Sequence, residues 1–451
     1  MKIVVCVKIV RDEINPFDAC ALECALQQTD AHTVVLCMGP SGCEKELKRL
    51  SRLGVNRVLL LSDPSFAGSD TLATSRILSC ALKKLKPDLV LCGRQSIDGD
   101  TAQVGPSLAA TLGYSLVPYI IKFSTDICQT RSGSVPLALP AVCTIERINT
   151  LRFPSFRSKP VPIEIWNRDA LEIEPERCGI AGSPTRVLQV FESKAERRSC
   201  QFIPRAELDS LVASLRNRVK ETFVEDPVSL PVVRLKHVLA IGPGVVPSAE
   251  SIAERVTEIP QLSALEIVDC IKAEQPDAVL WSADFWGRTI APQVAVHLQT
   301  GLCADCTRLE TDGNKLFMYR PASGDNVMAK IECRTRPAMA TVRGKNHTAE
   351  LVVACGHGAK ARLKQIRLWS DALGALRGAS RGLVDDRFAP YEEQVGLTGQ
   401  SLSPHLYVAI GISGAVQHMC GVVNAAWIVA INPDKNARIF DYADYGILDY
   451  F

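Results

Sequence analysis

The sequence has no long apolar run and no excess of charge of one sign. None of its apolar stretches approaches the 18 or so residues that a membrane-spanning helix needs. Lys and Arg together number 51 and Asp and Glu number 49, so the chain lacks the basic excess that contact with a nucleic-acid backbone requires. We therefore expect neither a membrane span nor a nucleic-acid partner.

The sequence also lacks a secretory signal and a complete metal-binding pattern. The N-terminal run MKIVVCVKIVRDEINPF has no small-residue cleavage site and is typical of a first strand. The 17 cysteines are an odd number scattered through apolar runs, as expected for buried thiols in a reducing compartment. The pairs Cys20 with Cys24 and Cys303 with Cys306 have no second pair to complete a zinc or iron–sulfur site. We expect a cytoplasmic protein without a metal centre.

Short apolar runs alternate with amphipathic stretches along the chain. Runs at 2–8, 33–39, 57–63 and 88–93 are separated by stretches of helical character, which predicts an α/β fold with a parallel sheet covered on both faces. Ligands of such sheets bind at the carboxyl ends of the strands. The length of 451 residues suggests roughly three domains.

An internal echo indicates that two of these domains are related. PDLVLCG at 87–93 is similar to PDAVLWS at 276–282. The similarity continues downstream, after a contraction of three residues, through Pro106 and Pro292, Ala109 and Ala295, Leu112 and Leu298, and Gly113 and Gly301. Chance similarity of two βαβ units is the alternative explanation. The prolines of FVEDPVSLPVV indicate a linker near 223–232, and a third unit begins near Glu350.

A glycine-bracketed turn follows the apolar run near the C-terminus, in LYVAIGISGAVQHMCG at 406–421. Gly411 and Gly414 allow backbone to approach a ligand, and free amides at the start of a helix can hold an anion such as a pyrophosphate. His418 on this helix could donate a hydrogen bond to a flavin carbonyl and stabilise the negative charge of the reduced ring. A single histidine in such a place can equally be a solvated or core residue.

A second loop, PYEEQVGLTGQSLSP at 390–404, has the same character. Gly396 and Gly399 frame Thr398, which suits a hydroxyl placed against a ring nitrogen. Arg381 upstream supplies a fixed positive charge that favours an anionic flavin. An ordinary surface loop with a capping threonine is the alternative.

The C-terminal motifs together resemble the flavin-binding domain of the electron transfer flavoprotein alpha subunit. The ordered motifs are GASR at 378–381, QVG-x-TG at 394–399, GISGA-x-QH at 411–418, VAIN at 429–432 and ADYGI at 443–447. The resemblance implies FAD contacts from Ser380, Arg381, Gln394, Thr398, Gly399, Ser413, Gly414, Gln417 and His418. It places Thr398 near the flavin N5 and His418 near its O2, with Asn432 and Asp449 toward the adenosine end. The segment 320–343 is similar to the first domain of that subunit.

The first half is similar to the beta subunit of the same family. The matching segments are INPFDACALECAL at 14–26, FAGSDTLATS at 66–75, GRQSIDGDTAQVGP at 93–106, LPAVCTIERIN at 139–149 and GIAGSPTRV at 179–187. Residues 98–101 follow a predicted strand and start a helix, so their amides and hydroxyls can cradle phosphate. The resemblance implies AMP or a second FAD held by Cys6, Val7, Lys8, Asn15, Asp70, Thr71, Thr74, Gly93, Arg94, Gln95, Gly99, Asp100, Thr101, Gln103, Val104 and Gly105.

The residues of the beta-like motifs are similar to those of the electron-bifurcating branch of the family. In that branch NADH reduces the beta-site FAD, and the electrons divide between a high-potential and a low-potential path. The partners implied are an acyl-CoA dehydrogenase-like flavoenzyme and a ferredoxin or flavodoxin. Residues 152–160 fall where the partner-recognition loop belongs, but this segment is several residues short and lacks the usual basic run. Leu397, His357 and Pro433 replace residues typical of the alpha-type flavin site.

The sequence therefore predicts a fused electron transfer flavoprotein. We expect a beta-like domain at 1–222, a linker at 223–235, an alpha-type first domain at 236–345 and an FAD-binding domain at 346–451. Two alternatives remain: a non-bifurcating carrier with one FAD and AMP, and a flavin-free nucleotide-binding regulatory module. The number of flavins per chain distinguishes these three.

Overall fold

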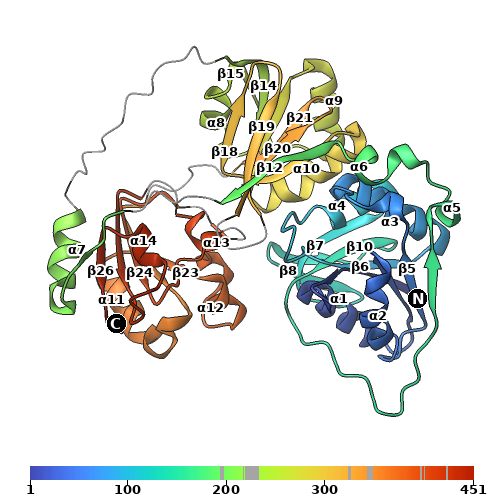
Figure 1. The fold of residues 1–451 in the computed structure, drawn as a ribbon, viewed down its shortest axis with the longest axis horizontal. Helices are drawn as coiled ribbons and strands as arrows, with labels where there is room; N and C mark the ends of the chain where they lie inside the picture. The colour runs from blue at the N-terminus through green and yellow to red at the C-terminus, as the bar shows by residue number, and fades with distance from the viewer. Residues whose placement is uncertain are drawn as a thin grey trace.

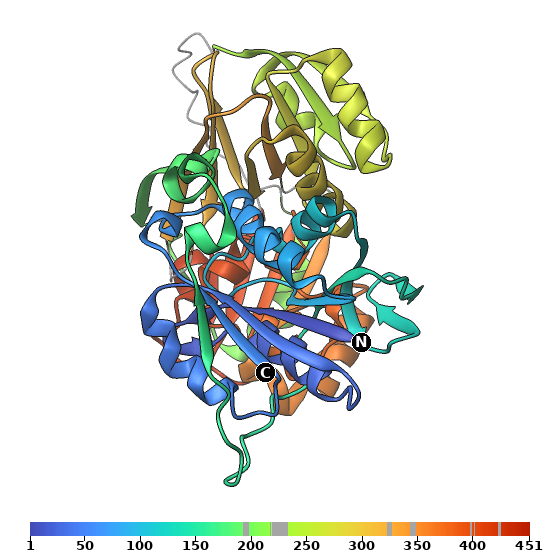
Figure 2. The same ribbon diagram turned by 90° about the vertical axis from the view of Figure 1, so that its right-hand side faces the viewer.

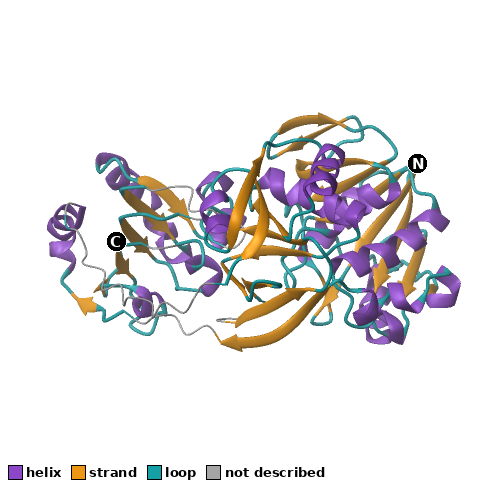
Figure 3. Cartoon of the chain, turned by 90° about the horizontal axis from the view of Figure 1, so that it is seen from above, coloured by secondary structure: helices purple, strands orange, loops and turns teal. Residues whose placement is uncertain are grey.

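The computed structural model describes residues 1–192, 198–216, 218, 233–322, 327–342, 349–396, 399–400, 402–422 and 425–451. Three sheets, each wholly or mainly parallel, form three lobes with their flanking helices (Figure 1), which confirms the predicted α/β class. The lobe with the N-terminus and the lobe with the C-terminus lie at opposite ends of the view from above (Figure 3). Among the described helices, none is both long and apolar enough to cross a membrane.

The first lobe is built on a nine-stranded sheet of order β11-β5-β4-β1-β6-β10-β7-β8-β9. Its strands are β1 (Lys2–Val7), β4 (His32–Met38), β5 (Arg57–Leu61), β6 (Leu89–Gly93), β7 (Ser115–Lys122), β8 (Ile127–Thr130), β9 (Gly133–Pro136), β10 (Ala141–Ile145) and β11 (Ile163–Trp166). All pairings are parallel from β11 to β7, whereas β7, β8 and β9 pair antiparallel. A small hairpin, β2 (Ile9–Val10) and β3 (Glu13–Ile14), forms a separate two-stranded sheet.

Helices cover both faces of this sheet, which is why its central strands are apolar throughout. The helices are α1 (Pro16–Leu26), α2 (Glu44–Leu50), α3 (Thr71–Leu85) and α4 (Val104–Leu112). Buried side chains form one core with α1 and α2 and a second core with α3 and α4. Both faces are thus removed from water, and the carboxyl edge remains for a ligand.

The second lobe has a parallel sheet of order β15-β14-β16-β21-β17 and an antiparallel sheet of order β12-β20-β19-β18. The parallel strands are β14 (Leu235–Ile241), β15 (Ala253–Ile259), β16 (Ala278–Ser282), β17 (Leu302–Cys306) and β21 (Ala338–Val342). The antiparallel strands are β12 (Thr185–Glu192), β18 (Arg308–Thr311), β19 (Leu316–Pro321) and β20 (Val327–Cys333). The helices are α8 (Val246–Glu250), α9 (Ala264–Glu274) and α10 (Phe285–Leu298), and α10 packs against α4 of the first lobe (Figure 2).

The repeated Pro-Asp motif has the same structural role in both lobes. Lys86 and Gln275 end helices α3 and α9 in the left-handed conformation, immediately before the two prolines. Asp88 then accepts a hydrogen bond from the Lys2 backbone N–H at 2.7 Å, and Asp277 accepts one from the Lys236 N–H at 3.0 Å. Each carboxylate thus joins the central strand to the start of the neighbouring strand.

The third lobe is built on a parallel sheet of order β13-β26-β25-β24-β22-β23. Its strands are β13 (Gln201–Phe202), β22 (Leu351–Cys355), β23 (Leu376–Ala379), β24 (Leu406–Ile410), β25 (Trp427–Ile431) and β26 (Tyr445–Ile447). Its helices are α7 (Leu208–Arg216), α11 (Leu363–Ala372), α12 (Arg381–Asp385), α13 (Val416–Met419) and α14 (Ile439–Tyr442).

A connecting arm, residues 185–192 and 198–216, joins the three lobes. Its strand β12 pairs antiparallel with β20 of the second lobe, and β13 pairs with β26 of the third. Leu208, Val212 and Leu215 of α7 belong to the core of the third lobe. The sequence expectation grouped these residues with the beta-like domain, and the domain limits remain predictions.

Candidate functional sites

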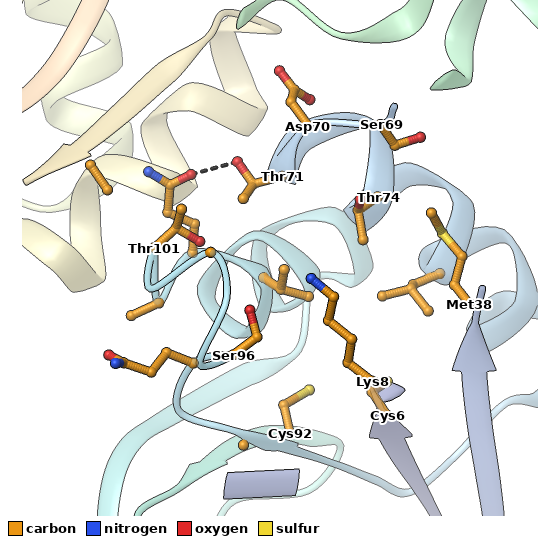
Figure 4. Close-up of a pocket in the computed structure, with 18 of the residues that line it drawn as sticks. Cys6, Lys8, Met38, Ser69, Asp70, Thr71, Thr74, Cys92, Ser96 and Thr101 are labelled. Atoms are coloured by element: carbon orange, nitrogen blue, oxygen red, sulfur yellow. Dashed lines mark hydrogen bonds between the residues drawn. The ribbon is translucent and has the colours of Figure 1, made fainter. Parts of the chain in front are cut away.

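The front pocket is a cavity of about 450 Å³ at the carboxyl ends of β1 and β6 (Figure 4). Most of the residues expected for the beta-type nucleotide line it: Cys6, Val7, Lys8, Asp70, Thr71, Thr74, Gly93, Arg94, Gln95, Gly99, Thr101, Gln103 and Val104. Sheet and helix ends thus bring together residues from three separate motifs. The volume lies in the range of small-molecule sites.

Three expected residues support the front pocket without lining it. Asn15 donates its amide to the Gln95 carbonyl at 2.9 Å, and its oxygen accepts from the Ile97 N–H at 3.2 Å. Asp100 accepts from the Gln95 side-chain amide at 2.5 Å. Gly105 lies against Thr144 of β10. These residues hold the loop after β6 in place.

The N-terminus of the 15-residue helix α3 faces this pocket. Asp70 caps the helix by accepting from the Ala73 N–H at 2.9 Å, and it also accepts from the Thr185 hydroxyl at 2.7 Å. Thr71 donates its hydroxyl to Gln103 at 2.5 Å, the contact dashed in Figure 4. The helix dipole and the remaining first-turn amides favour a negatively charged group here.

Asp18 is a pocket-lining residue that sequence reasoning did not single out. Its carboxylate accepts from the Lys8 backbone N–H at 2.8 Å and from the Gly93 N–H at 3.0 Å, which joins the ends of β1 and β6. Burial nevertheless raises its pKa to about 7. A Cβ at Gly93 would lie 2.3 Å from the Asp18 Oδ1, so this position requires glycine.

The second lobe closes the front pocket, which the sequence did not predict. Leu302, Cys303 and Ala304 from β17, with Arg320 from β19 and Ile331 from β20, complete the lining. Thr185 of the connecting arm also lines the pocket. Gln103 donates its amide to the Leu302 carbonyl at 3.2 Å across this boundary. The pocket thus requires both halves of the chain.

The rear pocket is a cavity of about 410 Å³ at the carboxyl ends of the strands of the third lobe. It brings together seven residues expected for the alpha-type FAD: Ser380, Arg381, Gln394, Ser413, Gln417, His418 and Asn432. Asp449 lines an adjoining cavity of about 300 Å³ that shares Gly358 and Gly411 with the rear pocket. Gly399 and Gly414 lie behind the lining, against the backbone of Gln394 and Ile439. Thr398 lies outside the described residues.

His418 presents a neutral ring to the rear pocket. It is 7% exposed, and its Nε2 lies 2.7 Å from the Tyr407 hydroxyl. Burial lowers the pKa of His418 to about 4 and raises that of Tyr407 well above its usual value, so both are uncharged at neutral pH. When Tyr407 donates to Nε2, the ring proton lies on Nδ1. Nδ1 is buried, and a hydrogen bond between the ring and the backbone of Val395 partly offsets the lowering of the pKa.

The two pockets approach each other at one aromatic ring. The guanidinium of Arg381, which lines the rear pocket, lies 5.6 Å from the centroid of Phe17. The guanidinium of Arg94, which lines the front pocket, lies 5.0 Å from the same centroid. An ion pair between Arg147 and Asp385, at 2.6 Å, also joins the first and third lobes. Phe17 on α1 therefore connects a cation of each pocket.

Among the described residues, no three His, Cys, Asp or Glu side chains lie close enough together to hold a metal ion.

The sequence matches two family models that correspond to these lobes. The electron transfer flavoprotein domain matches residues 3–151 and 257–370, and the electron transfer flavoprotein FAD-binding domain matches residues 346–423. The chain belongs to the electron transfer flavoprotein family. Because both models match one polypeptide, the predicted fusion is confirmed, and so is its nature as an FAD-binding electron-transport protein.

Individual relatives match either type of subunit. The chain is 37% identical to the electron transfer flavoprotein subunit alpha of Thermoanaerobacterium thermosaccharolyticum, over 41% of this chain and 70% of the relative. It is 38% identical to subunit beta of Clostridium acetobutylicum, over 39% of this chain and 73% of the relative. It is 34% identical to the caffeyl-CoA reductase-Etf complex subunit CarD of Acetobacterium woodii, over 47% of this chain and 87% of the relative.

Proposed function

We propose that this electron transfer flavoprotein holds one FAD in each pocket and divides electrons from NADH between two redox partners. The observation that carries the proposal is the wall that the second lobe adds to the front pocket, where Leu302, Ala304 and Ile331 give an apolar surface next to the loop that can cradle phosphate. An added apolar wall suits a flat ring system such as a flavin.

In the rear pocket, we propose that His418 and Arg381 tune the redox potential of FAD. A bound flavin supplies both one-electron and two-electron chemistry. A ring N–H of the neutral His418 can donate to a flavin carbonyl, which favours the negative charge of the reduced form. Arg381 adds a permanent positive charge. The Asn432 amide donates to the Ile412 carbonyl at 2.9 Å and holds the glycine-bracketed turn in position.

The contacts of Phe17 with Arg94 and Arg381 give the two proposed flavin sites a short protein connection. Electron transfer between two flavins requires that they lie close together and that the protein between them is rigid. The ion pair between Arg147 and Asp385 at 2.6 Å joins the first and third lobes and supports this arrangement. We propose that this arrangement serves transfer between the front and rear pockets.

For the partners, we propose an acyl-CoA dehydrogenase-like flavoenzyme as one acceptor and a ferredoxin or flavodoxin as the other. The name of CarD places that relative in a complex with a caffeyl-CoA reductase, which supports the first of these. Residues 152–160 project from the first lobe (Figures 1 and 2), and Phe153 and Phe156 on this segment are strongly exposed. Exposed aromatic side chains are typical of interaction surfaces, so the segment can dock a partner despite its short length.

A count of bound nucleotides tests the proposal. The purified chain is denatured, and the released FAD and AMP are quantified per polypeptide. Two FAD per chain support the proposal, and NADH should then reduce a high-potential and a low-potential acceptor together. One FAD with one AMP contradicts the second flavin and leaves a non-bifurcating carrier. Protein that contains no flavin and acquires none from added FAD contradicts both flavin sites.

A further inference from the structure

Arg320 is a buried cation in the front pocket that forms no ion pair with a carboxylate in the described part of the chain. It is 7% exposed on β19, and its guanidinium donates one hydrogen bond, to the Gly99 carbonyl at 2.8 Å. Its Nε is buried and has no hydrogen-bond partner in the described part of the chain. Placing a charge out of water without compensation is costly, so such a group requires an anion.

The other two basic residues of the lining already have acidic partners. Lys8 pairs with Asp98 at 2.6 Å, and Arg94 pairs with Glu146 at 3.6 Å. The acidic groups around Arg320 also have partners, because Asp305 pairs with Arg288 at 2.8 Å and Asp100 accepts from Gln95. Burial raises the pKa of Asp100, and the positive charges of Arg381, Arg320 and Arg94 oppose this rise. Within the described residues, Arg320 acts on the carboxyl group of Asp100, but it shares that group with Arg381 and Arg94 and forms no ion pair of its own.

The position of Arg320 indicates what neutralises it. Gly99, to which it donates, belongs to the loop after β6, whose amides are expected to cradle phosphate. The guanidinium is thus fixed at the phosphate end of the pocket, and its planar set of donors matches phosphate oxygens. We infer that Arg320 binds a phosphate group of the nucleotide in the front pocket. This inference rests on the proposed nucleotide site and adds a ligand residue from the second half of the chain.

Such a contact makes the nucleotide a link between two lobes. Its phosphate would contact the loop after β6 on one side and β19 of the second lobe on the other. Anion binding should therefore stabilise the boundary between these lobes, in addition to either lobe alone.

Titration of the full chain with AMP and with adenosine, which lacks the phosphate, tests Arg320. The protein is first dialysed to remove exchangeable nucleotide. Arg320→Gln should weaken AMP binding roughly 10- to 100-fold, as expected for loss of a hydrogen bond to a charged group, and should leave adenosine affinity unchanged. Arg320→Lys keeps the charge and should lose less. Arg308→Gln, on the neighbouring strand β18 and 68% exposed in its side chain, is the matched control and should bind AMP as the wild type does.

The outcomes separate this inference from the proposed function. Equal AMP affinity in the wild type and Arg320→Gln overturns the role of Arg320 and leaves the nucleotide site intact. A wild type that binds neither AMP nor FAD at the front pocket overturns both. If Arg320→Gln does not fold, Arg320→Met is measured instead, because it removes the charge and keeps a long side chain. Unchanged AMP affinity then overturns the inference, and a weakened, AMP-specific affinity supports it.

Discussion

The front and rear pockets occupy the same position in two parallel sheets, yet their buried polar groups differ in electrostatic character. The front pocket contains a buried carboxyl group, Asp18, whose pKa burial raises to about 7, and the buried guanidinium of Arg320. The rear pocket contains a buried imidazole, His418, whose pKa burial lowers to about 4. The difference teaches that the strand order positions a ligand, whereas residues just beyond the strands determine its electronic environment.

The comparison predicts opposite pH dependence for the two lobes, beginning with Asp18. The folded state keeps the Asp18 proton up to about pH 7, whereas the unfolded chain loses it near 3.8, so this group makes stability fall as pH rises through that window. The shift corresponds to about 4 kcal/mol. Asp18→Asn should remove this fall, measured as the melting temperature against pH. Asp30→Asn, at an exposed position, is the control, and parallel profiles for Asp18→Asn and the wild type would contradict the prediction.

For His418 the dependence of stability on pH has the opposite sign. The unfolded chain binds a proton near pH 6.5 and the folded state only near pH 4, so stability is lost as pH falls through this window. The shift corresponds to about 3 kcal/mol. His418→Gln should reduce the loss of stability between about pH 6.5 and pH 4. It should leave unchanged the loss of stability that Asp18 causes as the pH rises toward 7. If both losses change together, the pockets are not independent.

Glycine substitutions sharpen the comparison by disabling one pocket at a time. In Gly93→Ala the new Cβ would meet Asp18 Oδ1 at 2.3 Å, and in Gly356→Ala it would meet the Gly411 carbonyl oxygen at 2.1 Å. Each should cost about 1–3 kcal/mol and release the nucleotide of its own pocket only. Nucleotide content and melting temperature measure this. Gly42→Ala, whose Cβ meets nothing within 4 Å, should leave both pockets loaded.

Replacement of His418 should alter the potential of the rear flavin alone. His418→Phe removes the N–H donor that favours the reduced form, so the two-electron midpoint potential should become more negative by roughly 30–60 mV. Spectroelectrochemical titration measures the shift. An unchanged potential in protein that retains its flavin would show that His418 does not contact the ring.

The smallest expected effect comes from Tyr407→Phe, which removes only the hydroxyl that contacts His418 Nε2 at 2.7 Å. Without it the tautomer of the imidazole is no longer fixed, and part of the proposed donation to the flavin is lost. We expect a shift of roughly 10–30 mV in the same direction, as for one neutral hydrogen bond. The effect should disappear in the His418→Phe background, because no imidazole remains to orient.

Much of the architecture could be predicted from local patterns. Alternating apolar runs gave the strands β1, β4, β5 and β6, and the motif order gave the rear pocket, since most of its lining lies within one lobe. Arg320, Leu302 and Thr185 could not be found in this way. They reach the front pocket across a lobe boundary, which no local periodicity encodes.

Other features depend on tertiary contacts between distant segments. Asp18 stands in a quoted motif, but its role follows from the first turn of α1 meeting the ends of β1 and β6. Chain order suggested that 185–216 belongs with the preceding residues, whereas strand pairing places β12 and β13 in later sheets. Thr398 is still a prediction because it lies outside the described residues.

The connecting arm has a consequence for how the polypeptide is made. Because β12 and β13 are already built into sheets of the later lobes, a protease cut engineered between Arg218 and Val233 should leave two fragments that co-purify. The peptide bond there mainly guarantees equal synthesis and a high local concentration of the halves. Expression of the two halves from separate genes should then yield the same complex.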